Sequence, residues 1–203
     1  MRPSLVGLFL FKAIGWFVVC LLVWYQLGDH VTRPVAMFCD VAVAAFFPDW
    51  AEGVEQAGST LTLLTTLEVS GVAGVPPGHV AVLSPEVNFL QYGYGLPLLL
   101  ALLLASGARR LLAKAVFGAV ALVPFQVWGV CFDWLKQVTI ETAAVPVSTF
   151  ARELIALSYQ FGYLVLPATV PLLLWAMLDR RFLSAFILEA TLEGETEKAD
   201  GRN

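Results

Sequence analysis

Few residues in this sequence could take part in covalent chemistry. Cys39 is the cysteine expected nearest to water, and His30 and Arg33 precede it closely. A thiol, a base and a cation are what a cysteine nucleophile with a stabilised oxyanion requires. A helix starting at Pro34 would leave His30 and Arg33 before its first turn, so the spacing does not place the three groups on one face. We therefore predict a free thiol, buried or interfacial, and no catalytic residue.

No residue pattern predicts a metal or cofactor site. The three cysteines form no C-x-x-C pair, which argues against a metal site. Both histidines lie outside the apolar stretches, whereas a haem held between transmembrane helices needs His ligands at membrane depth. Asp49, Glu52 and Glu55 are spaced three apart and predict a solvated acidic surface. The motifs of phosphate loops, zinc proteases and serine hydrolases do not occur in the sequence.

Polar side chains within or beside the apolar stretches are better candidates for contact residues. An unpaired amide is costly in lipid, so such residues usually bond to another helix. Gln126 lies near the middle of one stretch, and Asp133 and Lys136 are three apart at its end, where they can pair on one helical turn. The candidate interhelical or partner contacts are Gln91, Tyr94, Gln126, Asp133, Lys136, Tyr159 and Gln160.

The elements that must position these residues follow from composition. Of 203 residues, 59% are hydrophobic and 14% are charged, whereas a soluble domain carries about 25% charged residues. Lys and Arg number 12 against 16 acids, without a basic stripe. These values exclude a water-soluble globule, a disordered chain and a nucleic-acid-binding protein. They predict a mainly α, polytopic membrane protein.

Four apolar stretches predict four transmembrane helices, at residues 5–27, 87–108, 115–132 and 154–178. The first would be an uncleaved anchor formed within residues 1–27, and the other three form a membrane region over 87–178. Residues 34–108 contain no Lys or Arg, while basic residues cluster at 109–114 and 180–181. By the positive-inside rule, we expect a bacterial inner-membrane protein with both termini in the cytoplasm. The tail, 179–203, would then be cytoplasmic, with a disordered end.

Residues 28–86 would form a small periplasmic α+β insertion. Residues 34–47 predict an interfacial helix, and the alternation over 60–70 predicts a strand that pairs with residues 79–83 in a hairpin over about 59–84. The helix could cover the apolar strand face with Phe38, Phe46 and Phe47. An unpaired strand edge could recruit another protein by strand addition, and the candidate docking residues are Thr60, Thr62 and Thr66.

Four segments resemble a known family: GVEQAGSTLTLLTTLEV (53–69), EVNFLQYGYGLPLLLALLLA (86–105), PFQVWGVCFDWLKQV (124–138) and ALSYQFGYLVLPATVPLLLW (156–175). Together they look like the small proteobacterial exosortase H-associated membrane proteins. The resemblance implies an inner-membrane companion of a protein-sorting transpeptidase system. It carries no functional residue over to this chain.

We therefore expect a non-enzymatic accessory protein that binds and positions a partner or substrate of an exosortase-type sorting system. Its partners would be membrane lipids and a multi-span membrane protein or its secreted substrate, with no nucleic acid and no cofactor. One alternative is a carrier or enzyme for a lipid-linked substrate, using the mouth of the bundle around Gln91, Tyr94, Tyr159 and Gln160. Another alternative is a structural subunit of a larger membrane complex.

Overall fold

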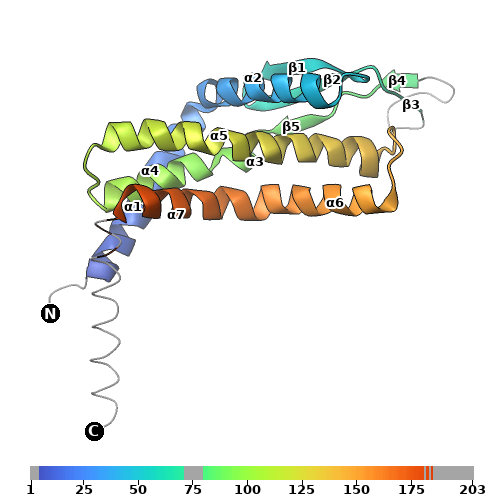
Figure 1. The fold of residues 1–203 in the computed structure, drawn as a ribbon. Helices are drawn as coiled ribbons and strands as arrows, with labels where there is room; N and C mark the ends of the chain where they lie inside the picture. Colours follow the sequence, from blue (N-terminus) through green and yellow to red (C-terminus); the bar gives the residue numbers. More distant parts are fainter. Residues whose placement is uncertain (1–4, 71–79, 181, 183, 185–203) are drawn as a thin grey trace, which may run out of the picture.

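The computed structural model describes residues 5–70, 80–180, 182 and 184. Among these residues, three helices are long and apolar enough to cross a membrane: Val6–Gln26, Leu111–Glu141 and Thr149–Leu178. Two small β-sheets accompany the helices (Figure 1). The expectation of a mainly helical membrane protein with a small β region is confirmed. Residues 71–79, most of which lie between the two expected hairpin strands, and the end of the tail are outside the described residues.

The first two helices follow one another almost without a break. Helix α1 spans Leu5–Gln26 and α2 spans Gly28–Phe46, with Leu27 between them. The expected start of the second helix at Pro34 is wrong, because the Leu27 carbonyl already accepts the backbone N–H of His30 at 2.9 Å. Pro34 lies inside α2, where it removes one backbone donor without ending the helix.

The second expected span is shorter than its apolar sequence suggests. Residues Glu86–Asn88 form strand β5, and helices α3 (Leu90–Gly93) and α4 (Gly95–Ala105) follow it. The apolar helical stretch is Leu90–Ala105, which is below the length of the three candidate spans. Helix α4 packs against α1, α5 and α7 and is largely buried. Helix α4 is therefore enclosed by three other helices of the same chain.

The last two helical segments are longer than expected. Helix α5 (Leu111–Lys136) continues as a π-helical turn, η1 (Gln137–Glu141). Helices α6 (Thr149–Gln160) and α7 (Leu166–Leu178) are joined by a second π-helical segment, η2 (Phe161–Val165). The two segments of 31 and 30 residues are each about 45 Å long at 1.5 Å per residue. Both are longer than the roughly 30 Å thickness of a hydrocarbon core.

The main sheet has three antiparallel strands in the order β1-β2-β5. Strand β1 spans Ala51–Ala57 and β2 spans Thr60–Thr65. The sequence did not predict β1, where Glu52 and Glu55 are exposed on a strand. The single strand expected over 60–70 is two strands, because β3 (Glu68–Ser70) pairs separately with β4 (Val80–Val82). Residues 80–82 of the expected partner segment therefore pair with β3, whereas β2 pairs with β1 and β5.

The expected unpaired edge at Thr60 and Thr62 is wrong. Strand β2 is the central strand, so Thr62 pairs with Glu55 on one side and Glu86 on the other. Thr66 lies between β2 and β3, and its backbone N–H donates to the Trp50 carbonyl at 3.0 Å. Strand addition at these three threonines would require backbone groups that the chain already uses.

The sheet packs on α2 through its apolar face. Leu61 and Leu63 of β2 are buried in a core with Val35, Cys39 and Val43 of α2. Helix α2 and the main sheet lie along one side of α5, and α6 and α7 lie along the other (Figure 1). The expectation that α2 covers the sheet is correct, but a different helix face does so. Phe38 and Phe46 are exposed, while Phe47 is partly buried.

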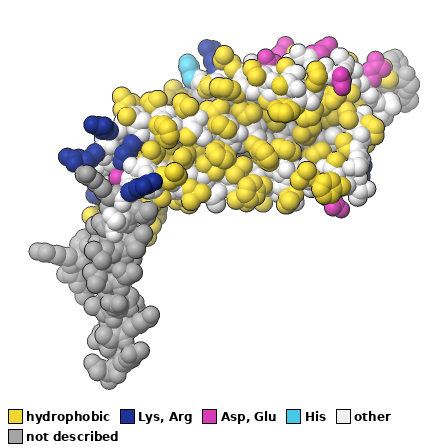
Figure 2. Space-filling model, in the orientation of Figure 1, with side chains coloured by type: hydrophobic (Ala, Val, Ile, Leu, Met, Phe, Trp, Pro, Cys, Tyr) yellow, Lys and Arg dark blue, Asp and Glu magenta, His cyan; other side chains and the backbone are white. Residues whose placement is uncertain are grey.

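Four helix ends meet at one end of the bundle. Phe9 near the start of α1 stacks on Trp175 near the end of α7, with ring centroids 5.3 Å apart. Ser106, which follows α4, donates to Asp179 Oδ2 at 2.7 Å, and Lys114 in the first turns of α5 contacts Asp179 Oδ1 at 3.2 Å. Lys and Arg side chains gather at this end (Figure 2). We call it the basic end; at the opposite end α5 passes beside the sheet.

Candidate functional site

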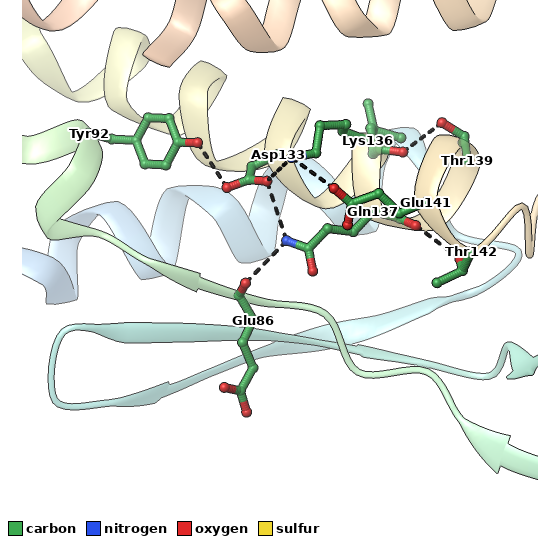
Figure 3. Close-up of polar contacts among 9 residues, drawn as sticks. Glu86, Tyr92, Asp133, Lys136, Gln137, Thr139, Glu141 and Thr142 are labelled. Carbon is green, nitrogen blue, oxygen red and sulfur yellow. Dashed lines mark hydrogen bonds and ion pairs between the residues drawn. The ribbon is translucent and has the colours of Figure 1, made fainter. Parts of the chain in front are cut away.

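Asp133 is the centre of a buried polar cluster at the junction between the helices and the sheet (Figure 3). The Tyr92 hydroxyl of α3 donates to Asp133 Oδ2 at 2.9 Å. Gln137 Nε2 donates to Asp133 Oδ1 at 3.4 Å and to the backbone carbonyl of Glu86 in β5 at 3.1 Å. One carboxylate therefore links α3, α5 and, through Gln137, the edge of the sheet.

Lys136 supplies the positive charge of this cluster. Its Nζ lies 3.7 Å from Asp133 Oδ1 and 3.0 Å from Glu141 Oε1. The same ammonium lies over the ring of Tyr159 in α6, 4.0 Å from its centroid. A cation over an aromatic face contributes about 0.5–2 kcal/mol, depending on desolvation. Lys136 thus connects α6 to the cluster, and the predicted Asp133–Lys136 ion pair is confirmed.

Local helix geometry explains why these side chains converge. Asp133, Lys136 and Gln137 are spaced i, i+3 and i+4, so they lie on one face of the helix. The helix then widens into η1, where the Thr142 hydroxyl donates to the Gln137 carbonyl at 2.9 Å. Single π-helical turns in longer helices often occur at functional sites. Glu141 is the last residue of this π-helical turn, and the turn brings its carboxylate into contact with Lys136 Nζ.

Close helix approach places the tyrosines of the cluster. Tyr92 contacts Tyr163 edge to face, and Tyr163 stacks on Tyr159, with ring centroids 5.9 Å apart in both pairs. The approach depends on glycine, because a Cβ on Gly162 would lie 2.9 Å from the Cα of Gly129. Small residues at such crossings let transmembrane helices pack backbone against backbone.

The remaining candidate contact residues do not form one site. Gln126 is buried between α5 and its neighbours, beside a cavity of about 10 Å³ lined also by Gly95 and Pro167. Its interhelical hydrogen bond stays a prediction. Gln91 and Gln160 are exposed; neither makes a side-chain hydrogen bond within the part of the chain that the structure describes. Tyr94 is partly buried.

An apolar groove lies between α2 and α5, and sequence reasoning did not predict it. Its volume is about 390 Å³, and its lining comes from both helices. On the α5 side, Trp128 and Phe132 lie with ring centroids 4.6 Å apart. On the α2 side, Phe46 is 76% exposed. We call this feature the α2–α5 groove; its lining residues are Ala42, Phe46, Phe47, Pro124, Val127, Trp128, Cys131, Phe132 and Leu135.

Cys39 lies beneath the groove and is completely buried. Cys131 of α5 packs against the same core, while His30 and Arg33 are exposed. The three residues considered for nucleophilic chemistry are therefore not assembled. Within residues 5–70, 80–180, 182 and 184, no group of three or more His, Cys, Asp or Glu side chains could hold a metal ion.

The Asp133 cluster can hold the sheet in place on the helices. Both oxygens of Asp133 have donors within the chain. The Tyr92 hydroxyl connects α3 to Asp133, Gln137 connects β5 to it, and Lys136 connects α6 to it. The sequence pattern at 133–137 identified Asp133 and Lys136, but it did not identify Tyr92, Glu86 or Gln137 as their partners.

These features define a small membrane protein in which a β-sheet packs on a helix bundle and is hydrogen-bonded to it through Gln137. The sequence model of the exosortase H-associated membrane protein family matches residues 3–182. The chain therefore belongs to this family, which confirms the resemblance seen in the sequence and indicates a membrane accessory role associated with an exosortase system. No curated protein and no solved structure matches the chain.

Proposed function

We propose that this protein is a non-enzymatic accessory protein that binds and positions an exosortase-type, multi-span partner in the bacterial inner membrane. The observation that carries the proposal is the α2–α5 groove, because it is apolar, lined by aromatic side chains and open at the protein surface. An apolar helix of a partner can enter such a groove and bury its side chains there. Family membership supports an exosortase-type partner.

The support for binding rather than catalysis comes from the polar groups. The charged side chains at the sheet junction are engaged with one another: Lys136 contacts both Asp133 and Glu141. A general base must reach a proton of the substrate, and Asp133 already accepts hydrogen bonds on both oxygens. The cluster instead connects α3, α6 and, through Gln137, β5 to α5. Helix α2, which forms one wall of the groove, packs on the sheet.

In the proposed membrane arrangement, α1, α3–α4, α5 and α6–α7 cross the bilayer in turn. The meeting of the start of α1, the end of α4, the start of α5 and the end of α7 supports four crossings. The basic end would face the cytoplasm, and so would both termini. The sheet would lie in the periplasm, consistent with the absence of Lys and Arg from residues 34–108.

Co-purification with an exosortase-type partner tests the proposed binding. Phe46→Ala should reduce the amount of partner retained in mild detergent several-fold, because Phe46 contributes an exposed aromatic surface to the groove. Phe117→Ala is the matched control, since Phe117 is a 60% exposed phenylalanine of α5 outside the groove. Equal retention by the two variants would refute docking at this groove.

A further inference from the structure

An open pocket lies at the basic end, away from both the groove and the Asp133 cluster. Its volume is about 840 Å³, and it is formed where α4 ends, α5 begins and α7 ends. Three exposed arginines line it: Arg109, Arg110 and Arg180. Lys and Arg side chains dominate the surface at this end of the molecule (Figure 2).

No ion pair within the described part of the chain neutralises the charge of the three arginines. Asp179, the acid that lines the pocket, already contacts Lys114 at 3.2 Å and accepts the Ser106 hydroxyl at 2.7 Å. The arginines make no ion pair with any residue that the structure describes. The charges of Lys114 and Asp179 cancel, so the described residues that line the cavity carry three net positive charges, which favour an anionic ligand.

The backbone at Arg110 adds to this preference. Arg110 has a left-handed conformation, with φ 56° and ψ 46°, and immediately precedes α5. Such a conformation costs about 1–2 kcal/mol for a residue with a side chain, and strain of this kind often persists at binding sites. No side chain caps the start of α5, so the positive end of the helix dipole adds to the potential of the arginines.

The surroundings identify the kind of anion. Exposed aliphatic side chains continue from the pocket along the bundle: Met177 of α7 is 63% exposed, and Leu112 of α5 is 78% exposed. A ligand with a phosphate group and acyl chains matches both the arginine-lined pocket and the aliphatic surface beside it. Basic pockets between membrane helices are known to bind lipid head groups. We propose that this pocket binds the head group of an anionic phospholipid, with its acyl chains along α5 and α7.

Thermal unfolding of the full chain in mild detergent tests the proposal. Phosphatidylglycerol should raise the unfolding temperature in a saturable way, whereas phosphatidylcholine and inorganic phosphate should not. Replacing Arg109, Arg110 and Arg180 together by Gln should weaken the apparent affinity about a hundredfold, from roughly 1 kcal/mol per arginine. Arg152→Gln, an exposed arginine of α6 outside the pocket, should leave the affinity unchanged.

A second variant separates binding from folding. Arg110→Gly removes one charge but suits the left-handed conformation, so its stability without lipid should be equal or higher, while its affinity should fall about fivefold. The proposal is overturned if the triple variant keeps the phosphatidylglycerol effect, or if Arg152→Gln loses as much affinity. An equal effect of inorganic phosphate would also overturn it, because the pocket would then bind a soluble anion.

Discussion

Replacing Tyr92 by Phe removes one hydroxyl from the Asp133 cluster and leaves its shape unchanged. The Tyr92 hydroxyl makes the shortest contact to Asp133, at 2.9 Å, whereas Gln137 and Lys136 contact the carboxylate at 3.4 Å and 3.7 Å. Asp133 is buried, so water cannot fully replace the lost donor. A hydrogen bond to a charged group contributes about 1.5–3 kcal/mol. We expect Tyr92→Phe to destabilise the protein by this amount.

Thermal unfolding in detergent measures the effect. For a chain of this size, 1 kcal/mol corresponds to about 2–4 °C, so the unfolding temperature should fall by about 3–12 °C. Tyr94→Phe is the matched control, because Tyr94 is partly buried on the neighbouring turn and its hydroxyl makes no hydrogen bond within the described residues. Its effect should stay below about 0.5 kcal/mol.

A double-mutant cycle isolates the bond itself. In an Asp133→Asn background, the acceptor is neutral, so Tyr92→Phe should cost only about 0.5–1.5 kcal/mol. The reasoning is refuted if Tyr92→Phe and Tyr94→Phe lower the unfolding temperature equally. It is also refuted if the cost of Tyr92→Phe is the same with Asp133 and with Asn at that position.

Three further predictions concern packing and topology. Gly162→Ala should lower the unfolding temperature in detergent by several degrees, because the new Cβ would meet the Gly129 backbone. Gly15→Ala is the control and should be neutral, since its Cβ would meet nothing within 4 Å. Equal effects of the two variants would contradict the close crossing. Gln126→Leu should lower the same temperature or weaken partner retention, and an unchanged variant would show that the buried amide makes no important bond. Labelling with an impermeant thiol reagent, on cells whose outer membrane is permeabilised, tests the topology at two exposed positions, 57 and 113. Ala57→Cys should be labelled and Ala113→Cys should be protected. The reverse pattern would contradict the proposed topology.

The sequence predicted the helices well where the pattern was long and continuous. Apolar stretches of 18 or more residues identify spans, and α1 and the centres of α5 and α6–α7 were found in this way. The helix ends were missed because polar residues that flank the apolar stretches are helical too. Ser148, for example, accepts the N–H of Ala151 at 3.2 Å and starts α6 before the apolar stretch.

The sheet was harder to predict because its order depends on distant segments. Strand β1 has two exposed glutamates, Glu52 and Glu55, and little apolar alternation, so its sequence resembles a solvated helix. Its edge is held by Asp40 of α2, which accepts the Val54 N–H at 3.0 Å. Strand β5 was assigned to a span because Val87 and Phe89 continue the apolar stretch. Only tertiary pairing with β2 distinguishes it from a helix.

The candidate site was predicted in part for the same reason. Asp133 and Lys136 are close in sequence, and helical spacing alone pairs them. Tyr92 bonds to Asp133 across 41 residues of sequence, and the Glu86 carbonyl bonds to Gln137 across 51 residues. No local pattern reports such contacts. The α2–α5 groove was missed because it depends on which face of α2 packs against the sheet. Sequence reasoning expected Phe46 to be buried there, whereas it lines the groove.

Site-specific photo-crosslinking in intact membranes tests the proposed docking most directly. A benzophenone amino acid placed at position 46 would replace the exposed Phe46 at the groove, and the same group placed at position 117 would replace Phe117 outside it. We expect position 46 to crosslink to an exosortase-type, multi-span protein identified by mass spectrometry, and position 117 to give no such product. Crosslinking of that partner from position 117 but not from position 46 would contradict docking in the α2–α5 groove.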